Sequence, residues 1–281
     1  MQIKEFKKYF FDALSKVYPK TEIQSFFNLL FEYKLKLSRV EIALQPETTI
    51  NKNELDFLQK AVFYLKKEIP IQYIIGETEF YGLKFTVNKN VLIPRPETEE
   101  LVDWIIASTP PNDQIKILDI GTGSGCIAIS LAKNLPNSTV YALDISTEAL
   151  KIAEQSAKKN NVFIHFFEAD ILNLNELQQS FNIIVSNPPY VRASEKLQMQ
   201  QNVLANEPHL ALFVEDNNAL LFYDKIADLA KKHLSKNGQL FFEINQYLGK
   251  ETVDLLQNLG FQNIELIKDV YGNDRMIECT R

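Results

Sequence analysis

The fold of this chain is decided by the stretch Ile115-Lys116-Ile117-Leu118-Asp119-Ile120-Gly121-Thr122-Gly123-Ser124-Gly125. Its first six residues form a short, mainly apolar run that predicts a buried strand. The three glycines that follow predict a turn that a ligand can approach closely, because glycine has no side chain to block it. Residues 126–134 then predict a helix. A strand, a glycine turn and a helix in this order are typical of the ligand-binding unit of an open α/β sheet.

Strands and helices go on alternating after this unit. Alternation of this kind predicts a largely parallel sheet with helices on both faces, a Rossmann-like α/β fold. The predicted strands are 139–143, 162–167, 181–186, 239–244, 264–268 and 276–279, and the predicted helices are 146–160, 217–234 with Gly238 just beyond its end, and one ending at Leu259.

The first seventy residues have a different, helical texture. Apolar residues recur at helical spacing from Ile3 to Val17. Capping boxes then predict three helix starts, at Thr21 with Gln24, Ser38 with Glu41, and Asn51 with Glu54. We therefore expect a helical substrate-docking domain over residues 1–70, a hairpin linker over 71–93 with strand-like pieces from Ile71, and the sheet domain over 94–281, with a helix starting near Pro96.

Composition narrows the class of protein. The chain has 281 residues, a formal net charge of -6 and a pI of about 5.3, which argue against a broad nucleic-acid surface. Its two cysteines lie far apart in sequence, and its three histidines share no metal-ligand spacing with them. No signal peptide or membrane-length apolar segment is visible. We expect a cytoplasmic monomer without a metal, a membrane contact or stable nucleic-acid binding.

The glycine spacing indicates which ligand the turn binds. A dinucleotide fingerprint requires a glycine at position 126, where this chain has Cys126, and no Walker motif is present. Asp144 ends the next strand and can accept from ribose hydroxyls, while Asp170 can reach an adenine amine with Ile171 against the ring. Asp119 would orient the turn or a ligand ammonium. These features match S-adenosylmethionine, and the predicted cofactor residues are Asp119, Gly121, Thr122, Gly123, Ser124, Gly125, Asp144, Asp170, Ile171 and Asn187.

A second motif, Asn187-Pro188-Pro189-Tyr190, follows the predicted strand 181–186. The prolines stiffen the loop and remove N–H groups, which leaves carbonyls free to accept hydrogen bonds. The Asn187 side-chain oxygen and the Pro188 carbonyl would accept from a planar –NH2 group, and Tyr190 would lie against its plane. The four residues are thus predicted to act in catalysis, and the residues alone predict an S-adenosylmethionine-dependent methyltransferase acting on a planar nitrogen.

Narrower motifs carry a family resemblance. The chain resembles the release factor glutamine methyltransferases (the HemK family) at Pro70–Gly76, Glu79–Gly82, Ile93–Glu99, Asn206–Leu212 and Asp269–Arg275. The resemblance implies that the substrate is the glutamine of the Gly-Gly-Gln motif in class I peptide chain release factors, and that the products are N5-methylglutamine and S-adenosylhomocysteine. It also implies substrate contacts from Arg95, Glu97 and the 187–190 motif, although by composition Arg95 and Glu97 are ordinary linker and capping charges. The family often has an aromatic residue where this chain has Ile171.

Three other readings remain open at this point. A methyltransferase of DNA or RNA amino groups would use the same motif on a flipped base. A ribosomal-protein glutamine methyltransferase is the near relative, and usually differs after its Pro-Arg. A non-catalytic cofactor-binding module is the third, and the intact 187–190 motif argues against it.

Overall fold

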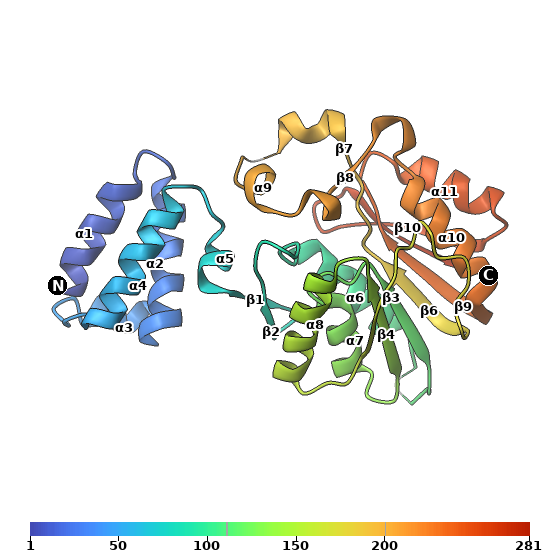
Figure 1. Cartoon of the computed structure of the whole chain (residues 1–281), viewed down its shortest axis with the longest axis horizontal. Helices are drawn as coiled ribbons and strands as arrows, with labels where there is room; N and C mark the ends of the chain where they lie inside the picture. Colours follow the sequence, from blue (N-terminus) through green and yellow to red (C-terminus); the bar gives the residue numbers. More distant parts are fainter. Residues whose placement is uncertain (111, 200) are drawn as a thin grey trace. The chain divides into compact units, whose positions relative to one another are not determined.

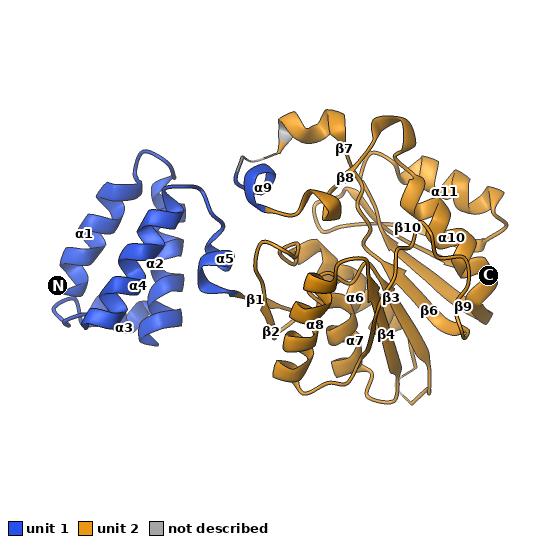
Figure 2. Ribbon diagram, in the orientation of Figure 1, with its two compact units in different colours: residues 1–76, 200–206 blue, residues 77–199, 207–281 orange. Residues whose placement is uncertain are grey.

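The computed structural model describes residues 1–110, 112–199 and 201–281, and these form two compact units. Unit 1 contains residues 1–76 and 201–206, and unit 2 contains the remaining described residues, 77–199 and 207–281 (Figure 2). Unit 1 is therefore built from two segments that are far apart in the sequence. Within the described ranges, each helix is too short or too polar to cross a bilayer.

Unit 1 is helical. Its core is rich in aromatic rings, and Phe27 and Phe31 stack with ring centroids 4.2 Å apart. Burying such rings is a large part of what stabilises a bundle of this size. The helices are α1 (Ile3–Leu14), α2 (Lys20–Leu35), α3 (Arg39–Leu44), α4 (Lys52–Leu65), α5 (Ile71–Ile75) and α9 (Gln201–Asn206) (Figure 1).

Two of the three predicted capping boxes in unit 1 are confirmed. Ser38 caps α3 and Asn51 caps α4, each with a reciprocal bond from the glutamate three residues on. The box at Thr21 is wrong, because α2 begins at Lys20 and its N-cap is Pro19. The strand-like reading from Ile71 is also wrong. Residues 71–75 form the one-turn helix α5, which starts after Pro70 and is closed by Gly76 at a φ of +81°.

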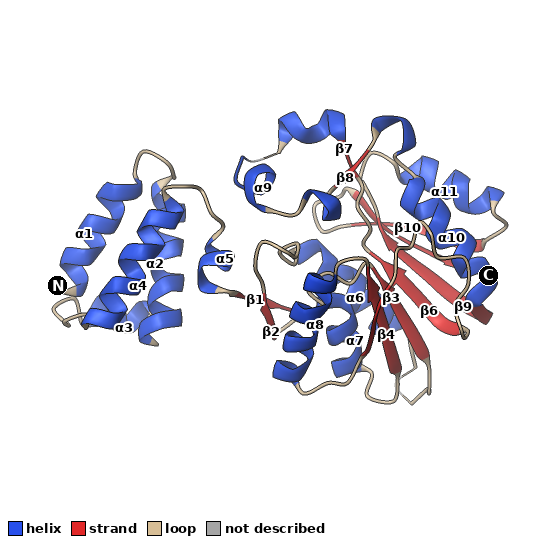
Figure 3. Cartoon of the chain, viewed as in Figure 1, coloured by secondary structure: helices blue, strands red, loops and turns tan. Residues whose placement is uncertain are grey.

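The predicted α/β sheet is confirmed in unit 2 (Figures 1 and 3). The sheet has seven strands in the order β10-β11-β9-β6-β3-β4-β5. The pairs from β9 through β5 are parallel, and β11 pairs antiparallel with both of its neighbours. The strands are β3 (Lys116–Ile120), β4 (Thr139–Asp144), β5 (His165–Glu168), β6 (Phe181–Ser186), β9 (Leu234–Glu243), β10 (Gln262–Lys268) and β11 (Asp274–Thr280).

Helices cover both faces of this sheet. One core cluster joins the sheet to α6 (Pro96–Ser108), α7 (Cys126–Asn134) and α8 (Thr147–Asn160), and a second joins it to α10 (Leu221–His233) and α11 (Gly249–Asn258). The predicted hairpin is present as β1 (Glu77–Phe80) and β2 (Leu83–Thr86). A further parallel pair, β7 (Val191–Arg192) with β8 (Phe213–Val214), and three short 3-10 helices, η1 (Ala193–Gln198), η2 (His209–Ala211) and η3 (Asp216–Asn218), complete unit 2.

Several boundaries in unit 2 differ from the prediction; for example, α10 begins at Leu221 instead of 217, and β9 begins at Leu234 instead of 239. Gly238 does not follow a helix end: α10 stops at His233, and Gly238 lies inside β9, where the pairing with β6 shifts register. A Cβ there would come within 3.1 Å of the Asn182 carbonyl oxygen, so glycine is needed for this close approach. The third strand begins at His165 instead of 162, because the Val162 amide still bonds to Ala157 at the end of α8.

Candidate active site

A cavity of about 250 Å³ opens where β3, β4 and β6 end at their carboxyl edge. This is the edge at which open α/β sheets bind ligands. Four predicted site residues, Glu97, Asp119, Gly125 and Tyr190, are not among the described residues that line the cavity. The predicted residues that do line it are Arg95, Gly121, Thr122, Gly123, Ser124, Asp144, Asp170, Ile171, Asn187, Pro188 and Pro189.

The glycine turn (Gly121–Gly125) forms one wall of the cavity. Gly121 and Gly123 have φ values of +75° and +54°, and no described heavy atom lies within 4 Å of the position that a Cβ would take at either one. The open space above these two glycines is therefore available to a ligand. Gly125 has a different task. A Cβ on it would lie 2.9 Å from Ile129 Cδ1 and 3.1 Å from Ala153 Cβ, so this glycine allows α7 and α8 to pack closely.

Asp119 lies beneath the glycine turn and is fully buried. Its Oδ2 accepts a 2.6 Å hydrogen bond from Thr122 Oγ1, whereas its Oδ1 has no partner among the described residues. Burial raises the pKa of this carboxyl to about 7, against the opposing effect of the Thr122 bond. A backbone hydrogen bond from Ala128 also lowers the pKa of Asp119, and a cationic ligand group close to this carboxyl would favour its ionised form.

The carboxylates of Asp144 and Asp170 shape the adjoining wall. Asp144 accepts from the backbone N–H of Gly123 and of Ser146, both at 2.9 Å. Burial raises the pKa of the Asp144 carboxyl above its ordinary value, although these two bonds lower it. Asp170 accepts from the Leu172 amide at 2.9 Å. A carboxylate has about four acceptor sites, so both residues keep capacity for ligand hydroxyl or amine groups.

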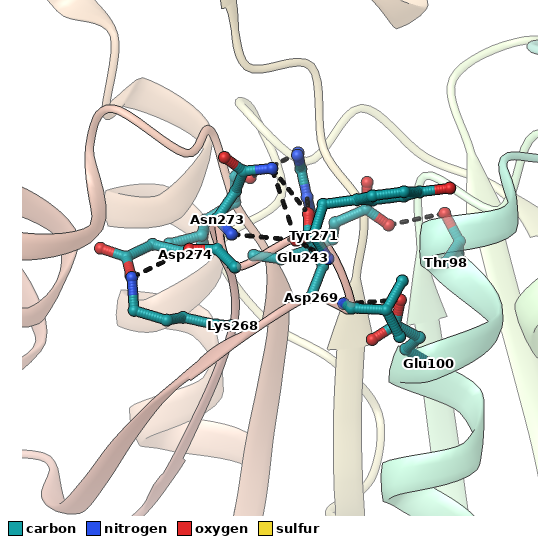
Figure 4. Close-up of polar contacts among 12 residues, drawn as sticks. Thr98, Glu100, Glu243, Lys268, Asp269, Tyr271, Asn273 and Asp274 are labelled. Carbon is teal, nitrogen blue, oxygen red and sulfur yellow. Dashed lines mark hydrogen bonds and ion pairs between the residues drawn. The ribbon is translucent and has the colours of Figure 1, made fainter.

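The clamp (Asn187-Pro188-Pro189-Tyr190) begins directly after β6 and is held by a buried carboxylate. Asn187 Nδ2 donates to Thr98 Oγ1 at 3.3 Å, and Thr98 Oγ1 donates to Glu243 Oε2 at 2.6 Å, the bond drawn in Figure 4. The hydroxyl of Tyr190 donates to the other oxygen, Glu243 Oε1, at 3.0 Å. Glu243 thereby connects both ends of the clamp, while the predicted contact of the Tyr190 ring with a substrate amide stays a prediction.

Glu243 is 1% exposed, and burial raises the pKa of its carboxyl, while the bonds from Thr98 and Tyr190 and the charge of Arg275 lower it. Arg275 is fixed in turn by Asp269, whose Oδ2 accepts from Arg275 Nε at 3.1 Å. Asp269 begins the turn between β10 and β11, and its Oδ1 accepts from the amides of Tyr271 and Asn273 (Figure 4). The Asp269–Arg275 motif is thus a rigid support behind Glu243.

Arg95 and Glu97 differ in their surroundings. Arg95 Nη2 pairs with Glu207 Oε1 at 2.7 Å, and the Ile93 amide donates to the other oxygen of the same carboxylate at 3.2 Å. Glu207 thus ties the segment before α6 to the 207–212 segment of the cavity wall. Glu97 lies in the first turn of α6, where an acidic residue is favoured by the helix dipole.

One cysteine lines the cavity, and it is not a thiolate. Cys126 lines the cavity, but burial raises the pKa of its thiol to about 12, so it stays protonated. No group of three or more His, Cys, Asp or Glu side chains in the described part of the chain could hold a metal ion.

Sequence reasoning missed three residues of this site: Thr98, Glu207 and Glu243. Glu243 gives a usable signal, since it is a charged residue between Phe242 and Ile244 in a predicted buried strand, and buried charges are rare unless paired. Thr98 and Glu207 lie inside the motifs 93–99 and 206–212 that carry the family resemblance, but their contacts could not be inferred, because their partners lie 145 and 112 residues away in the sequence.

Comparisons with known proteins give the relatives of this chain. The pattern described as "Methyltransferase small domain" matches residues 103–213, and the one described as "PrmC N-terminal domain" matches residues 8–76. A release factor glutamine methyltransferase of Flavobacterium psychrophilum is 55% identical, covering 99% of both chains. One from Bacteroides thetaiotaomicron is 42% identical, covering 97% of this chain and 98% of the other. The crystal structure of a methyltransferase from Pyrococcus furiosus, 18% identical, aligns with a TM-score of 0.50 over 79% of this chain and 96% of that one, which supports the fold alone.

Proposed function

The chain belongs to the release factor glutamine methyltransferase family, and on that premise we propose that it methylates the side-chain amide nitrogen (N5) of the glutamine in the Gly-Gly-Gln motif of a class I peptide chain release factor. The observation that carries the proposal is that residues 187–189 of the clamp and residues 121–124 of the glycine turn line one cavity. One wall suits a nucleoside cofactor, and the other suits a planar amide.

The residues of the cavity fit S-adenosylmethionine. Gly121 and Gly123 leave open space at the turn, and Asp119 Oδ1 is a buried acceptor with no described donor. In the proposed complex Asp144 accepts from the ribose hydroxyls, Asp170 accepts from the adenine amine, and Asp119 faces the methionine ammonium. Bound there, the cofactor supplies a methyl group that is already activated by its sulfonium.

The clamp has to orient a poor nucleophile, because the lone pair of an amide nitrogen is delocalised into its carbonyl. In the proposed reaction Asn187 Oδ1 and the Pro188 carbonyl oxygen each accept one of the two amide hydrogens. These bonds hold the nitrogen in line with the methyl group, about 3 Å from it. They also stabilise the positive charge that develops on nitrogen as the new bond forms. The methylated nitrogen is then strongly acidic and releases a proton to water, so a strong base is not required.

We assign a substrate-docking role to residues 1–70, as an expectation that rests on family membership. The protein substrate must present an exposed glutamine loop to the cavity, and a separate helical unit gives it a second surface to bind. We place the reaction in the cytosol, where release factors act, with the enzyme as a monomer.

The test is methyl transfer from labelled S-adenosylmethionine to a purified class I release factor, beside a variant whose Gly-Gly-Gln glutamine is replaced by alanine. We expect label on the first protein and none on the second. Label on both would contradict the proposed acceptor residue. No label on either, with the cofactor still bound in calorimetry, would reject the release factor and turn the search to ribosomal protein and then to nucleic acid, whose binding would weaken with salt.

A further inference from the structure

The clamp residue Asn187 is only useful to an amide substrate in one of its two side-chain flips. With its oxygen toward the cavity it accepts a hydrogen from the substrate –NH2, and with its own –NH2 toward the cavity it meets the substrate as donor against donor. The two flips have almost the same shape, so packing alone separates them poorly. The neighbouring hydrogen bonds must make the choice.

Thr98 is the neighbour whose hydrogen bond selects the flip of the Asn187 amide. A threonine hydroxyl has one proton to donate and two lone pairs to accept with. The 2.6 Å bond to Glu243 Oε2 uses the proton, since a carboxylate can only accept. The oxygen that Thr98 presents to Asn187 is therefore an acceptor, and at 3.3 Å it requires the Nδ2 side of the amide. The opposite flip would place two acceptors against each other.

Glu243 fixes the direction of this chain of bonds. It receives hydrogen bonds from Tyr190 and Thr98 on its two oxygens, and Arg275 acts on it with a positive charge. Burial raises the pKa of Glu243, while the bonds from Thr98 and Tyr190 and the charge of Arg275 lower it. Oε1 accepts from Tyr190 and Oε2 accepts from Thr98, so neither oxygen donates a proton to Thr98. The Asp269–Arg275 pair holds that positive charge in place.

We propose that Thr98 and Glu243 are positioning residues that set the flip of the Asn187 amide, and through it the preference of the site for an amide over a carboxylate substrate. This inference rests on the proposed function for its substrate. A glutamate side chain in place of the substrate glutamine has no –NH2 to donate, so the wild-type flip of Asn187 rejects it. The reversed flip would accept it, because the Asn187 –NH2 could then donate to the carboxylate.

Three variants test the proposal: Thr98→Val, Thr98→Ser and Glu243→Gln. Valine has nearly the shape of threonine but lacks the hydroxyl, whereas serine keeps both the donor and the acceptor. We expect Thr98→Val to lower kcat on the release factor about tenfold to a hundredfold, and Thr98→Ser to stay within about threefold of wild type. Affinity for S-adenosylmethionine, measured by calorimetry, should change little in either variant.

Substrate preference gives a readout that a merely structural role would not move. Binding of the release factor is compared with binding of its Gln→Glu variant, in the presence of S-adenosylhomocysteine. We expect wild type and Thr98→Ser to prefer glutamine, and the preference to narrow about tenfold in Thr98→Val. Glu243→Gln should narrow it less, because a glutamine amide can meet Thr98 either as donor or as acceptor. Equal preferences and equal kcat in Thr98→Val and Thr98→Ser would overturn the proposal.

A final measurement needs no substrate. In ¹⁵N-labelled enzyme, the side-chain –NH2 signal of Asn187 is identified by its loss in Asn187→Ala. We expect the signal of the proton that bonds to Thr98 to shift in Thr98→Val and to keep its position in Thr98→Ser. The melting temperature of each variant shows whether it folds. An unmoved signal in Thr98→Val would contradict the bond. If wild type transfers no methyl to the release factor, the proposed substrate fails, while this signal still decides the flip.

Discussion

The glycine turn and the clamp follow the neighbouring strands β3 and β6 at one cavity, yet they are held in different ways. The turn is fixed by bonds that span at most 21 residues of the chain: Asp119 to Thr122, and Asp144 to Gly123 and Ser146. The clamp is fixed by side chains from α6, the end of β6 and the end of β9, namely Thr98, Asn187 and Glu243. A substitution in the glycine turn should affect the turn alone, whereas a substitution at Thr98, Asn187 or Glu243 should affect the whole clamp. Binding and turnover should therefore separate in mutagenesis.

The largest expected effect is on the clamp. Asn187→Ala should lower kcat about a hundredfold to a thousandfold, because it removes a group that stabilises charge in the transition state. Affinity for S-adenosylmethionine should stay within about threefold, because the glycine turn, Asp144 and Asp170 are untouched. Methyl-transfer kinetics and calorimetry measure the two effects. Asn258→Ala, on an exposed position at the end of α11, is the matched control. A parallel fall in kcat and cofactor affinity would contradict the separate roles of the clamp in turnover and of the glycine turn in cofactor binding.

The next largest expected effect is on cofactor binding at the glycine turn. Asp144→Ala should weaken S-adenosylmethionine binding about tenfold to a hundredfold, since it removes charge-assisted bonds to the ligand and to the Gly123 amide. The rate at saturating cofactor should change much less. Titration calorimetry gives the affinity, and Asp254→Ala on the exposed side of α11 serves as the control. If affinity is unaltered, the ribose contact belongs to another residue.

A third effect concerns stability. Gly125→Ala should lower the free energy of unfolding by about 2 to 3 kcal/mol, because its φ of +81° is strained for alanine and its Cβ would meet Ile129 and Ala153. Gly121→Ala carries the strain without the clash, so about 1 kcal/mol is expected, together with weaker cofactor binding. Urea unfolding measures both values. Equal losses in the two variants would show that packing at Gly125 is less tight than the distances indicate.

The smallest effect is a pH dependence of cofactor binding. The pKa of Asp119 is raised to about 7, and a ligand ammonium would favour its ionised form. Binding should therefore weaken as the pH falls through 7, and the dissociation constant should be about tenfold higher at pH 6 than at pH 8, by linkage. Proton release in calorimetry would accompany binding at pH 6. Asp119→Asn should flatten this dependence, and a wild-type enzyme with a flat profile would place the ammonium elsewhere.

The same contrast explains what the sequence could predict. The strands, the helix starts at Pro96, Cys126 and after Ser146, and the glycine turn followed from local patterns, because each depends on residues within a few positions of one another. The one-turn helix α5 was mistaken for strand, because a five-residue apolar run fits either structure. Gly238 was mistaken for a helix end, because the close approach that requires it involves a neighbouring strand.

In the site, several residues that line the cavity could be predicted from the sequence. The residues that hydrogen-bond to the lining residues and fix their positions could not. Asp144, Asp170 and Asn187 each follow or end a strand, so their place at the carboxyl edge could be inferred. Thr98 and Glu207 depend on contacts over more than a hundred residues, for which one sequence has no pattern. The contact of the Tyr190 ring with a substrate amide stays a prediction, and the bond of its hydroxyl to Glu243 was not foreseen.

Unit 1 takes its last helix, α9, from the middle of the chain, and Asn206 Nδ2 on that helix donates to the Glu68 carbonyl oxygen at 3.2 Å. The unit is therefore not a cassette that a single cut after Gly76 can release. A truncated enzyme starting at residue 77 would keep α9 while losing the partners on which it folds. Chimeras that exchange this unit between relatives should transplant residues 1–76 and 201–206 together.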